Sequence, residues 1–126
     1  TLQWLMFQMS GIGPMFGQVG FFNKFAGRHY EDKRPRDRYI AEARRLLGVL
    51  DQRLQGRDWI MGDTYTIADM ATFPWVHNLI GFYEAGDLVG IADFEQVTRV
   101  LGEFLARPAV TRRAAALYRP QKNRYP

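Results

Sequence analysis

Few side chains in this sequence are of the types that carry out covalent or acid–base chemistry. Ser10 is the only serine, and the two histidines, His29 and His77, lie far from it along the chain. A hydrolytic triad needs a nucleophile, a base and an orienting acid in contact, and the sequence indicates no such arrangement. Neither histidine has a second histidine three or four residues away, the spacing that places two metal ligands on one helix face. We therefore expect no complete catalytic set and no metal site within the chain.

One polar pair has a clear structural interpretation. Thr66 and Asp69 stand three residues apart before an apolar run, which is the pattern of a helix-capping box. Asp69 would also suit acid–base chemistry, but its place in the box favours a structural role by about four to one. His77 lies in the apolar run that follows, and we interpret it as a hydrogen-bonded core histidine.

Composition limits the classes of protein to be considered. The 126 residues are one domain's worth, and 47% hydrophobic with 24% charged residues is ordinary for a globular protein. The absence of cysteine excludes disulfides, zinc–thiolate sites and a cysteine nucleophile, and it fits a reducing compartment such as the cytoplasm. The chain starts at Thr1 without an initiator methionine or a signal peptide, as expected of a piece cut from a longer protein.

Neither a membrane nor a nucleic acid is the expected partner. The first 26 residues carry a single charge, on Lys24, but glutamines, Ser10 and Pro14 interrupt the apolar run too often for a membrane span. From Arg99 onward, seven Arg or Lys residues face one acid, Glu103. Without a zinc-finger or RNA-recognition pattern beside it, this charge is typical of a solvated helix face and a frayed end.

Hydrophobic periodicity predicts an all-α bundle of about five helices. They cover approximately residues 2–25, 35–55, 67–82, 94–106 and 108–118. The second is the clearest, because its apolar residues form one stripe: Tyr39, Ala43, Leu46, Leu47, Leu50 and Leu54. The third has no consistently polar face, so we expect it to be the central, buried helix. Asp93 and Gln96 have capping-box spacing at the start of the fourth.

The first predicted helix is rich in glycine. Gly11, Gly13, Gly17 and Gly20 lie within it, and each costs roughly 1 kcal/mol relative to alanine in a helix. Pro14 predicts a bend near Gly13. Close approach of a neighbouring helix, another domain or a ligand would offset the cost of the glycines.

Several segments together resemble one family. Residues 2–5 (LQWL) and 11–18 (GIGPMFGQ) are similar to the first helix of the carboxy-terminal domain in nu-class bacterial glutathione transferases, which include disulfide-bond oxidoreductases. Arg38-Tyr39, Glu42 and residues 45–54 resemble the second helix of that domain. Residues 59–62, 65–71 and 74–75 resemble the start of the buried helix found in most glutathione transferases, and residues 107–110 (RPAV) match a late turn. The resemblance covers about nine tenths of the chain, with residues 11–18 pointing to the nu-like group.

The resemblance implies a division of labour in a larger, dimeric enzyme. A thioredoxin-like amino-terminal domain, absent from residues 1–126, would bind most of the glutathione and stabilise its thiolate. The helical domain would form the wall of the pocket for a small electrophile or disulfide, and much of the homodimer interface. It would turn one face of the first helix towards the absent domain, which makes these residues candidates for substrate binding: Phe7, Ser10, Gly11, Pro14 and Met15. We expect the isolated chain to be inactive.

Three alternatives accompany these expectations. The glycine-lined side of the first helix could admit the absent domain or a substrate, or it could equally mark a tight contact with another helix. Arg38 matches an arginine that reaches glutathione bound by the neighbouring subunit, and its guanidinium suits a carboxylate, but it could instead pair with Glu42 on a solvated surface. The whole domain could serve as a non-enzymatic scaffold, because a fold does not dictate a function.

Overall fold

A computed structural model of the chain describes residues 1–117, and these form an all-α bundle, as the sequence predicts. The helices are α1 (Leu2–Phe7), which continues through a π-helical turn (Gln8–Ile12) into α2 (Gly13–Asn23), then α3 (Arg34–Leu54), α4 (Ile67–Ile80), α5 (Glu95–Leu105) and α6 (Pro108–Leu117). Within residues 1–117 there is no strand, and no helix is long and apolar enough to cross a membrane. The basic end predicted beyond Leu117 lies outside the described residues.

The first helical run changes its winding just before Pro14. The sequence predicts a bend near Gly13, and a π-helical turn occupies Gln8–Ile12 at this place. Proline has no N–H group, and its ring clashes with the carbonyl four residues earlier, here that of Ser10. A π turn moves these carbonyls relative to the ring, so the helix accommodates Pro14 without ending.

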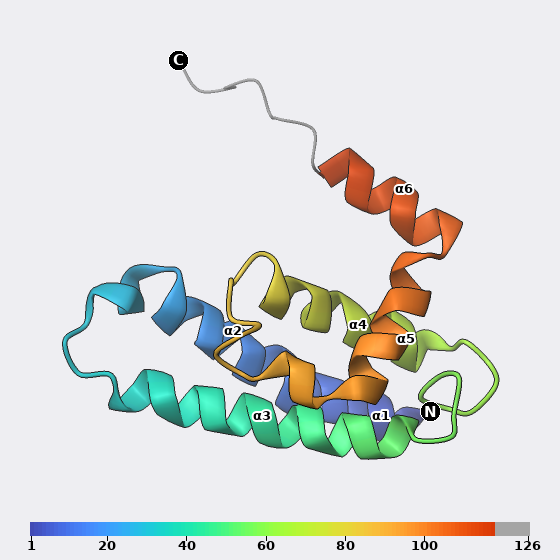
Figure 1. Cartoon of the computed structure of the whole chain (residues 1–126), viewed down its shortest axis with the longest axis horizontal. Coiled ribbons are helices and arrows are strands. Elements are labelled where there is room, and N and C mark those ends of the chain that lie inside the picture. Colours follow the sequence, from blue (N-terminus) through green and yellow to red (C-terminus); the bar gives the residue numbers. More distant parts are fainter. Residues whose placement is uncertain (118–126) are drawn as a thin grey trace.

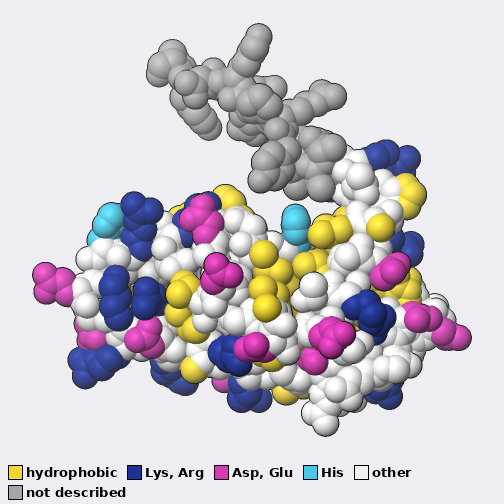
Figure 2. All heavy atoms as spheres, in the orientation of Figure 1, with side chains coloured by type: hydrophobic (Ala, Val, Ile, Leu, Met, Phe, Trp, Pro, Cys, Tyr) yellow, Lys and Arg dark blue, Asp and Glu magenta, His cyan; other side chains and the backbone are white. Residues whose placement is uncertain are grey.

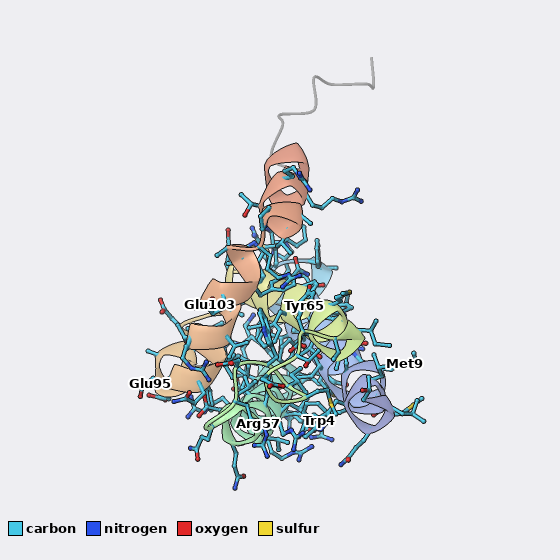
Figure 3. The ribbon with its side chains drawn as sticks, turned by 90° about the vertical axis from the view of Figure 1, so that its right-hand side faces the viewer. Trp4, Met9, Arg57, Tyr65, Glu95 and Glu103 are labelled. Atoms are coloured by element: carbon cyan, nitrogen blue, oxygen red, sulfur yellow. The ribbon has the colours of Figure 1, made fainter. Side chains whose placement is uncertain are left out.

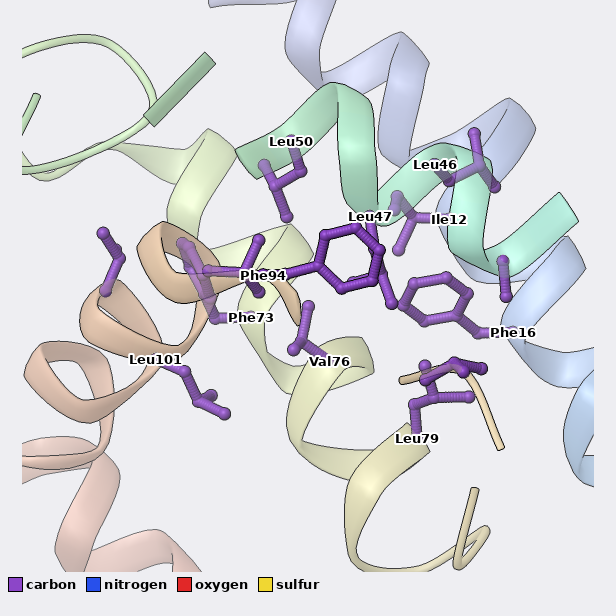
Figure 4. Packing of buried hydrophobic residues seen from close by; sticks show 14 of the residues in the cluster. Ile12, Phe16, Leu46, Leu47, Leu50, Phe73, Val76, Leu79, Phe94 and Leu101 are labelled. Atoms are coloured by element: carbon purple, nitrogen blue, oxygen red, sulfur yellow. The ribbon is translucent and has the colours of Figure 1, made fainter. Parts of the chain in front are cut away.

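The core lies where α3, α4 and α5 meet the first helical run (Figure 4). The stripe predicted for α3 is confirmed, because Ala43, Leu46, Leu47, Leu50 and Leu54 are all buried and Tyr39 is half-buried against the core. They face buried residues of α4 and of the first run, among them Phe16, Phe73 and Val76. Each buried side chain of this size stabilises the fold by roughly 1.5–3 kcal/mol, so packing, not chain-local propensity, holds the helices together.

The start of α5 corrects one expectation. Asp93 and Gln96 do not form a capping box, and no side chain of the N-cap residue accepts a hydrogen bond. Instead, Oδ1 of Asp51 in α3 accepts hydrogen bonds from the backbone N–H groups of Gln96 (2.8 Å) and Val97 (3.0 Å). Asp93 pairs with Arg44 of α3 at 3.2 Å. Both acids therefore tie α5 and the preceding turn to α3.

The last helix extends away from the bundle (Figure 1). Its base is fixed by Arg107, whose guanidinium lies 3.6 Å from the centre of the Tyr65 ring. The hydroxyl of Thr111 donates a hydrogen bond to the carbonyl of Leu105 (2.7 Å), which joins α6 to the end of α5. Because α6 projects from this base, a space is left between it and α4.

Candidate functional site

The five candidate residues of the first helical run divide between its surface and its interior. Ser10 and Pro14 are exposed, whereas Phe7, Gly11 and Met15 are half-buried, with Phe7 and Met15 packed against the core. The hydroxyl of Ser10 donates a hydrogen bond to the carbonyl of Met6 (2.7 Å). The Ser10 hydroxyl is therefore engaged by its own helix, and among the described residues no histidine or acid hydrogen-bonds to it as a catalytic base would.

The glycines of this run mostly face other parts of the described chain, which favours a tight contact over a glycine-lined side open to a domain or substrate. A Cβ atom added at Gly11 would lie 3.2 Å from Leu46 of α3, and one at Gly13 would lie 3.4 Å from Trp75 of α4. At Gly20 it would lie 2.5 Å from the ring of Tyr83. Only Gly17, among these four, has no atom within 4 Å of that position. Contacts within the described chain thus account for three of the four glycines: with α3 at Gly11, with Gln8 and α4 at Gly13, and with the turn after α4 at Gly20.

Arg38 lies exposed in the first turns of α3 and does not pair with Glu42. Glu42 instead pairs with Arg45 at 2.7 Å, three residues later. The hydrogen bond from Arg45 lowers the pKa of the Glu42 carboxyl below its ordinary 4.5, against an opposing effect of burial, and the charges of Arg45 and Arg38 add to the lowering. Within the described residues, the Arg38 guanidinium makes no hydrogen bond or ion pair, so its donors face solvent.

Arg38 belongs to a basic end of the molecule. Lys and Arg side chains gather where α2 is joined to α3, with a few acids between them (Figure 2). Two arginines of this end are paired with neighbouring acids, Arg34 with Asp32 at 2.8 Å and Arg36 with Asp37 at 3.2 Å. Arg38 is therefore the arginine of the α3 start that has its charge available for a carboxylate outside the described chain.

The capping box at α4 is present and is a structural feature. The Thr66 hydroxyl oxygen accepts a hydrogen bond from the N–H of Ala68 (3.2 Å). Asp69 is fully buried, and its two carboxylate oxygens accept hydrogen bonds from the N–H groups of Ile60 (3.0 Å) and Thr66 (2.9 Å). Both oxygens are thus engaged by the backbone, which fixes the loop before α4 onto the helix.

The outer side of α4 differs from what its sequence suggests. His77 is exposed, so its interpretation as a core histidine is wrong, and Ile67 and Met70 are exposed to 55% and 50%. α1 lies beside α4, and Met6 of α1 and Met9 of the π-helical turn are exposed to 51% and 66%. Met9 points away from the bundle (Figure 3). The lack of a polar face on α4 predicts burial all round, and the structure shows instead that its outer side is exposed.

A groove opens between α4 and the base of α6. Its volume is about 540 Å³. The lining is mainly apolar, and Figure 2 shows hydrophobic side chains gathered between these helices. No residue that the structure describes belongs to a group of three or more His, Asp or Glu side chains able to hold a metal ion. The described chain therefore presents an apolar groove and an unpaired, exposed Arg38, with no assembled catalytic group among the described residues.

This helical bundle with its capped α4 matches the domain described by a known family. Residues 35–107 match the family model described as glutathione S-transferase, C-terminal domain. The chain belongs to this family. The part matched includes α3, α4 with its capping box, and α5.

Relatives and solved structures agree with this membership. The disulfide-bond oxidoreductase YghU of Escherichia coli is 38% identical over 89% of this chain and 39% of its own length. A glutathione transferase family member from Pseudomonas fluorescens, solved with two glutathione molecules, is 76% identical over 88% of this chain and 49% of its own, with a TM-score of 0.87. A glutathione transferase from Pseudomonas putida, solved with one glutathione disulfide per subunit, is 63% identical with a TM-score of 0.86, over 94% of this chain and 50% of its own. The chain thus spans half or less of the length of these three relatives.

Proposed function

We propose that this chain is the carboxy-terminal half of a cytoplasmic, dimeric glutathione transferase or disulfide-bond reductase. The observation that carries the proposal is its 76% identity to a glutathione transferase family member that holds two glutathione molecules and is about twice as long as the matched region. An amino-terminal half with a thioredoxin-like fold would bind most of the glutathione and stabilise its thiolate. A cysteine-free sequence is compatible with a reducing compartment, in which glutathione remains a thiol.

In this proposal the first helical run forms part of the wall of the pocket for a small electrophile or disulfide. Ser10 and Pro14, which are exposed, would contact the substrate directly. Phe7 and Met15, which are half-buried and pack against the core, would support the wall from its inner side. Gly11 would contribute less to the wall, because the position of its missing side chain faces Leu46. Its lack of a side chain mainly allows the first helical run to approach α3. No residue of the chain supplies the nucleophile, since that is the glutathione sulfur.

Arg38 would bind a carboxylate of glutathione, held by the neighbouring subunit in the dimer. Its position supports this role, because it is exposed and has no partner among the described residues, while Arg34 and Arg36 are paired. A planar guanidinium can donate two parallel hydrogen bonds to a carboxylate, and such charged bonds are worth about 1.5–3 kcal/mol each. Loss of one bond of this strength corresponds to a weakening of roughly tenfold or more in affinity.

The experiment is a substitution in a two-domain protein that joins this chain to the amino-terminal half of the P. fluorescens relative. Arg38→Ala should raise the Kd for glutathione about tenfold or more in calorimetry, with the unfolding temperature unchanged. Arg34→Ala, which removes the arginine one helical turn before Arg38 that is paired with Asp32, should leave the Kd unchanged. Equal Kd values for Arg38→Ala and the unsubstituted protein would exclude this role for Arg38.

A second experiment tests the division of labour. The 126-residue chain alone should bind no glutathione in calorimetry, because its groups contact only one end of the ligand in this proposal. Tight binding by the chain alone would contradict the division of labour. A two-domain protein that folds but binds no glutathione would favour the scaffold alternative.

A further inference from the structure

The connection between α2 and α3 carries positive charge beyond that of Arg38. Between residues 24 and 38 the chain has six basic and three acidic residues. Two of these acids are held in the surface ion pairs described above. Arg28, Lys33 and Arg38 form no ion pair within the part of the chain that the structure describes. This end of the bundle therefore keeps an excess of positive charge at its surface (Figure 2).

The backbone that carries these charges is packed tightly against α2 and α3. A short 3-10 turn (Ala26–His29) follows α2, and Gly27 within it is buried. A Cβ atom added at Gly27 would lie 2.9 Å from the Cα atom of Phe22, so the turn rests directly on α2. The ring of Phe22 stacks on Tyr39 of α3 with 5.7 Å between the ring centres, and Tyr30 packs edge-on against Phe22 at 6.1 Å. The turn is thus held in a fixed position relative to the start of α3.

Two of the cations stand close to Arg38. Lys33 is the N-cap residue of α3, and its Nζ donates a hydrogen bond to the carbonyl of Arg28 (2.8 Å). Arg38 follows five residues after Lys33, which is roughly 7.5 Å along the helix axis at 1.5 Å per residue. The screening length is ~10 Å at about 0.1 M salt. An anion bound near Arg38 therefore lies within the electrostatic field of Lys33, and Arg28 adjoins Lys33.

We propose that Arg28 and Lys33 select the acceptor by charge, and favour a disulfide or electrophile that carries a carboxylate over a neutral one of similar size. This inference rests on the proposed function, because the role of Arg38 in the dimer brings the neighbouring subunit's glutathione to this end. Arg38 is then occupied by a carboxylate of glutathione. Arg28 and Lys33 remain as the cations that a negatively charged acceptor meets beside it.

The two cations act on binding and take no part in the bond changes. The glutathione thiolate attacks one sulfur of the disulfide, the S–S bond breaks, and the other half leaves as a thiolate. A second glutathione thiolate attacks the mixed disulfide and releases the remaining half, so two glutathione molecules are oxidised and one acceptor disulfide is reduced. A positive surface raises the local concentration of an anionic acceptor and stabilises it when bound.

The experiment compares matched acceptors in the two-domain protein described above. Dithiodipropionate carries two carboxylates, and bis-hydroxyethyl disulfide is neutral and of similar size. Chloronitrobenzoate and chlorodinitrobenzene form the corresponding pair for transfer of glutathione to an aryl ring. The quantity compared is the ratio of kcat/KM for the anionic acceptor to kcat/KM for the neutral one, after subtraction of the uncatalysed rate. A ratio cancels any effect of a substitution on glutathione itself.

Removal of both charges should lower this ratio. Two unit charges about 8 Å apart in water attract one another enough to change an equilibrium roughly twofold. The double variant Arg28→Gln/Lys33→Gln should therefore lower the ratio about fivefold at about 0.01 M salt. In the unsubstituted protein the ratio should fall by a similar factor when the salt is raised to about 1 M, because the screening length is then only ~3 Å.

Three control variants distinguish charge from structure. Arg28→Lys and Lys33→Arg retain the positive charge and should retain the ratio. Arg112→Gln removes an exposed cation from α6, which lies far from the α2–α3 connection (Figure 1), and should leave the ratio unchanged. The unfolding temperature of each variant is measured. If Lys33→Gln disturbs the fold through its lost hydrogen bond, Arg28→Gln alone should still lower the ratio about twofold.

The possible results separate this inference from the proposed function. An unchanged ratio in a folded double variant that still converts both acceptors would overturn charge selection and leave the proposed function in place. A similar fall of the ratio in Lys33→Arg would also overturn it, because the charge is retained there. No conversion of either pair of acceptors by the two-domain protein would contradict the proposed function and this inference together.

Discussion

The buried carboxylate of Asp69 gives the sharpest prediction for stability. Asp69→Ala removes both hydrogen bonds to the backbone, at 3.0 Å to Ile60 and 2.9 Å to Thr66. Each buried N–H left without a partner costs about 1–3 kcal/mol, and the half-buried Thr66 lies at the lower end of this range. We expect a loss of about 2–4 kcal/mol in the free energy of unfolding, which is a large share of the ~5–15 kcal/mol of an ordinary domain.

The assay is urea unfolding followed by far-ultraviolet circular dichroism, in which the midpoint reports stability and the slope reports the surface exposed on unfolding. Asp69→Asn retains one oxygen and should lose about 1–3 kcal/mol. The matched control is Asp37→Ala, because Asp37 also lies in the first turn of a helix but is exposed and only pairs with Arg36 at the surface. Its loss should stay below about 1 kcal/mol. Equal losses for Asp69→Ala and Asp37→Ala would refute the reasoning that the two buried bonds fix this loop.

Three further predictions follow from the packing and from one ion pair. Gly17→Ala should raise the free energy of unfolding by about 0.5–1 kcal/mol because space is free there. Gly20→Ala should lower it, because its Cβ would meet the Tyr83 ring at 2.5 Å. Urea unfolding measures both changes, and changes of the same sign in the two variants would contradict this prediction. Thr72→Val should leave stability unchanged or raise it by up to about 1–2 kcal/mol, since the buried Thr72 hydroxyl has no hydrogen-bond partner within the described chain; a clear loss on urea unfolding would indicate a hydrogen bond made by that hydroxyl. The pKa of Glu42 is lowered on folding, so its contribution to the free energy of unfolding is full above the ordinary pKa of 4.5 and is lost as the pH falls through the lower folded pKa. The free energy of unfolding of Glu42→Gln, measured at a series of pH values, should therefore differ from that of the unsubstituted chain near pH 7 and converge with it in acid. A difference that persists in acid would contradict this prediction.

The features that the sequence predicts well depend on neighbours along the chain. The stripe of α3 follows from a helical period within one segment, and the box at Thr66 and Asp69 needs only four consecutive residues. The π turn before Pro14 was located, although as a bend, because proline acts on the carbonyl four residues earlier. In each case the interacting groups lie within one or two turns of each other.

The features that the sequence misses join residues far apart. Asp51 caps α5 from 45 residues away, and no local pattern marks it as a cap. Arg44 donates a hydrogen bond to the carbonyl of Val89 (2.7 Å) across a similar separation. The pairing of Glu42 with Arg45 in place of Arg38 depends on side-chain rotamers that the spacing alone leaves open. Such contacts depend on how the helices pack against one another. The hydrophobic period within one segment of the sequence does not reveal that packing.

The candidate site shows the same division. Arg38 was identified by its resemblance to a family motif, and its exposure on α3 agrees with a role outside the chain. The groove at α6 was missed because it is formed by α4 together with the α5–α6 junction, more than 25 residues further along. An apolar helix face reads identically in sequence whether its cover is a neighbouring helix or another domain.

The glycines and the outer face of α4 therefore differ from what the sequence suggests for them. The described chain covers most of the glycines, and it leaves the outer face of α4 exposed. Glycines in a helix lower its stability, and this cost needs an explanation only where nothing else offsets it. Close packing against Leu46, Trp75 and Tyr83 supplies that offset at Gly11, Gly13 and Gly20 without any further domain. Exposed Ile67 and Met70, by contrast, gain nothing from the bundle itself, since about half of each side chain remains in water.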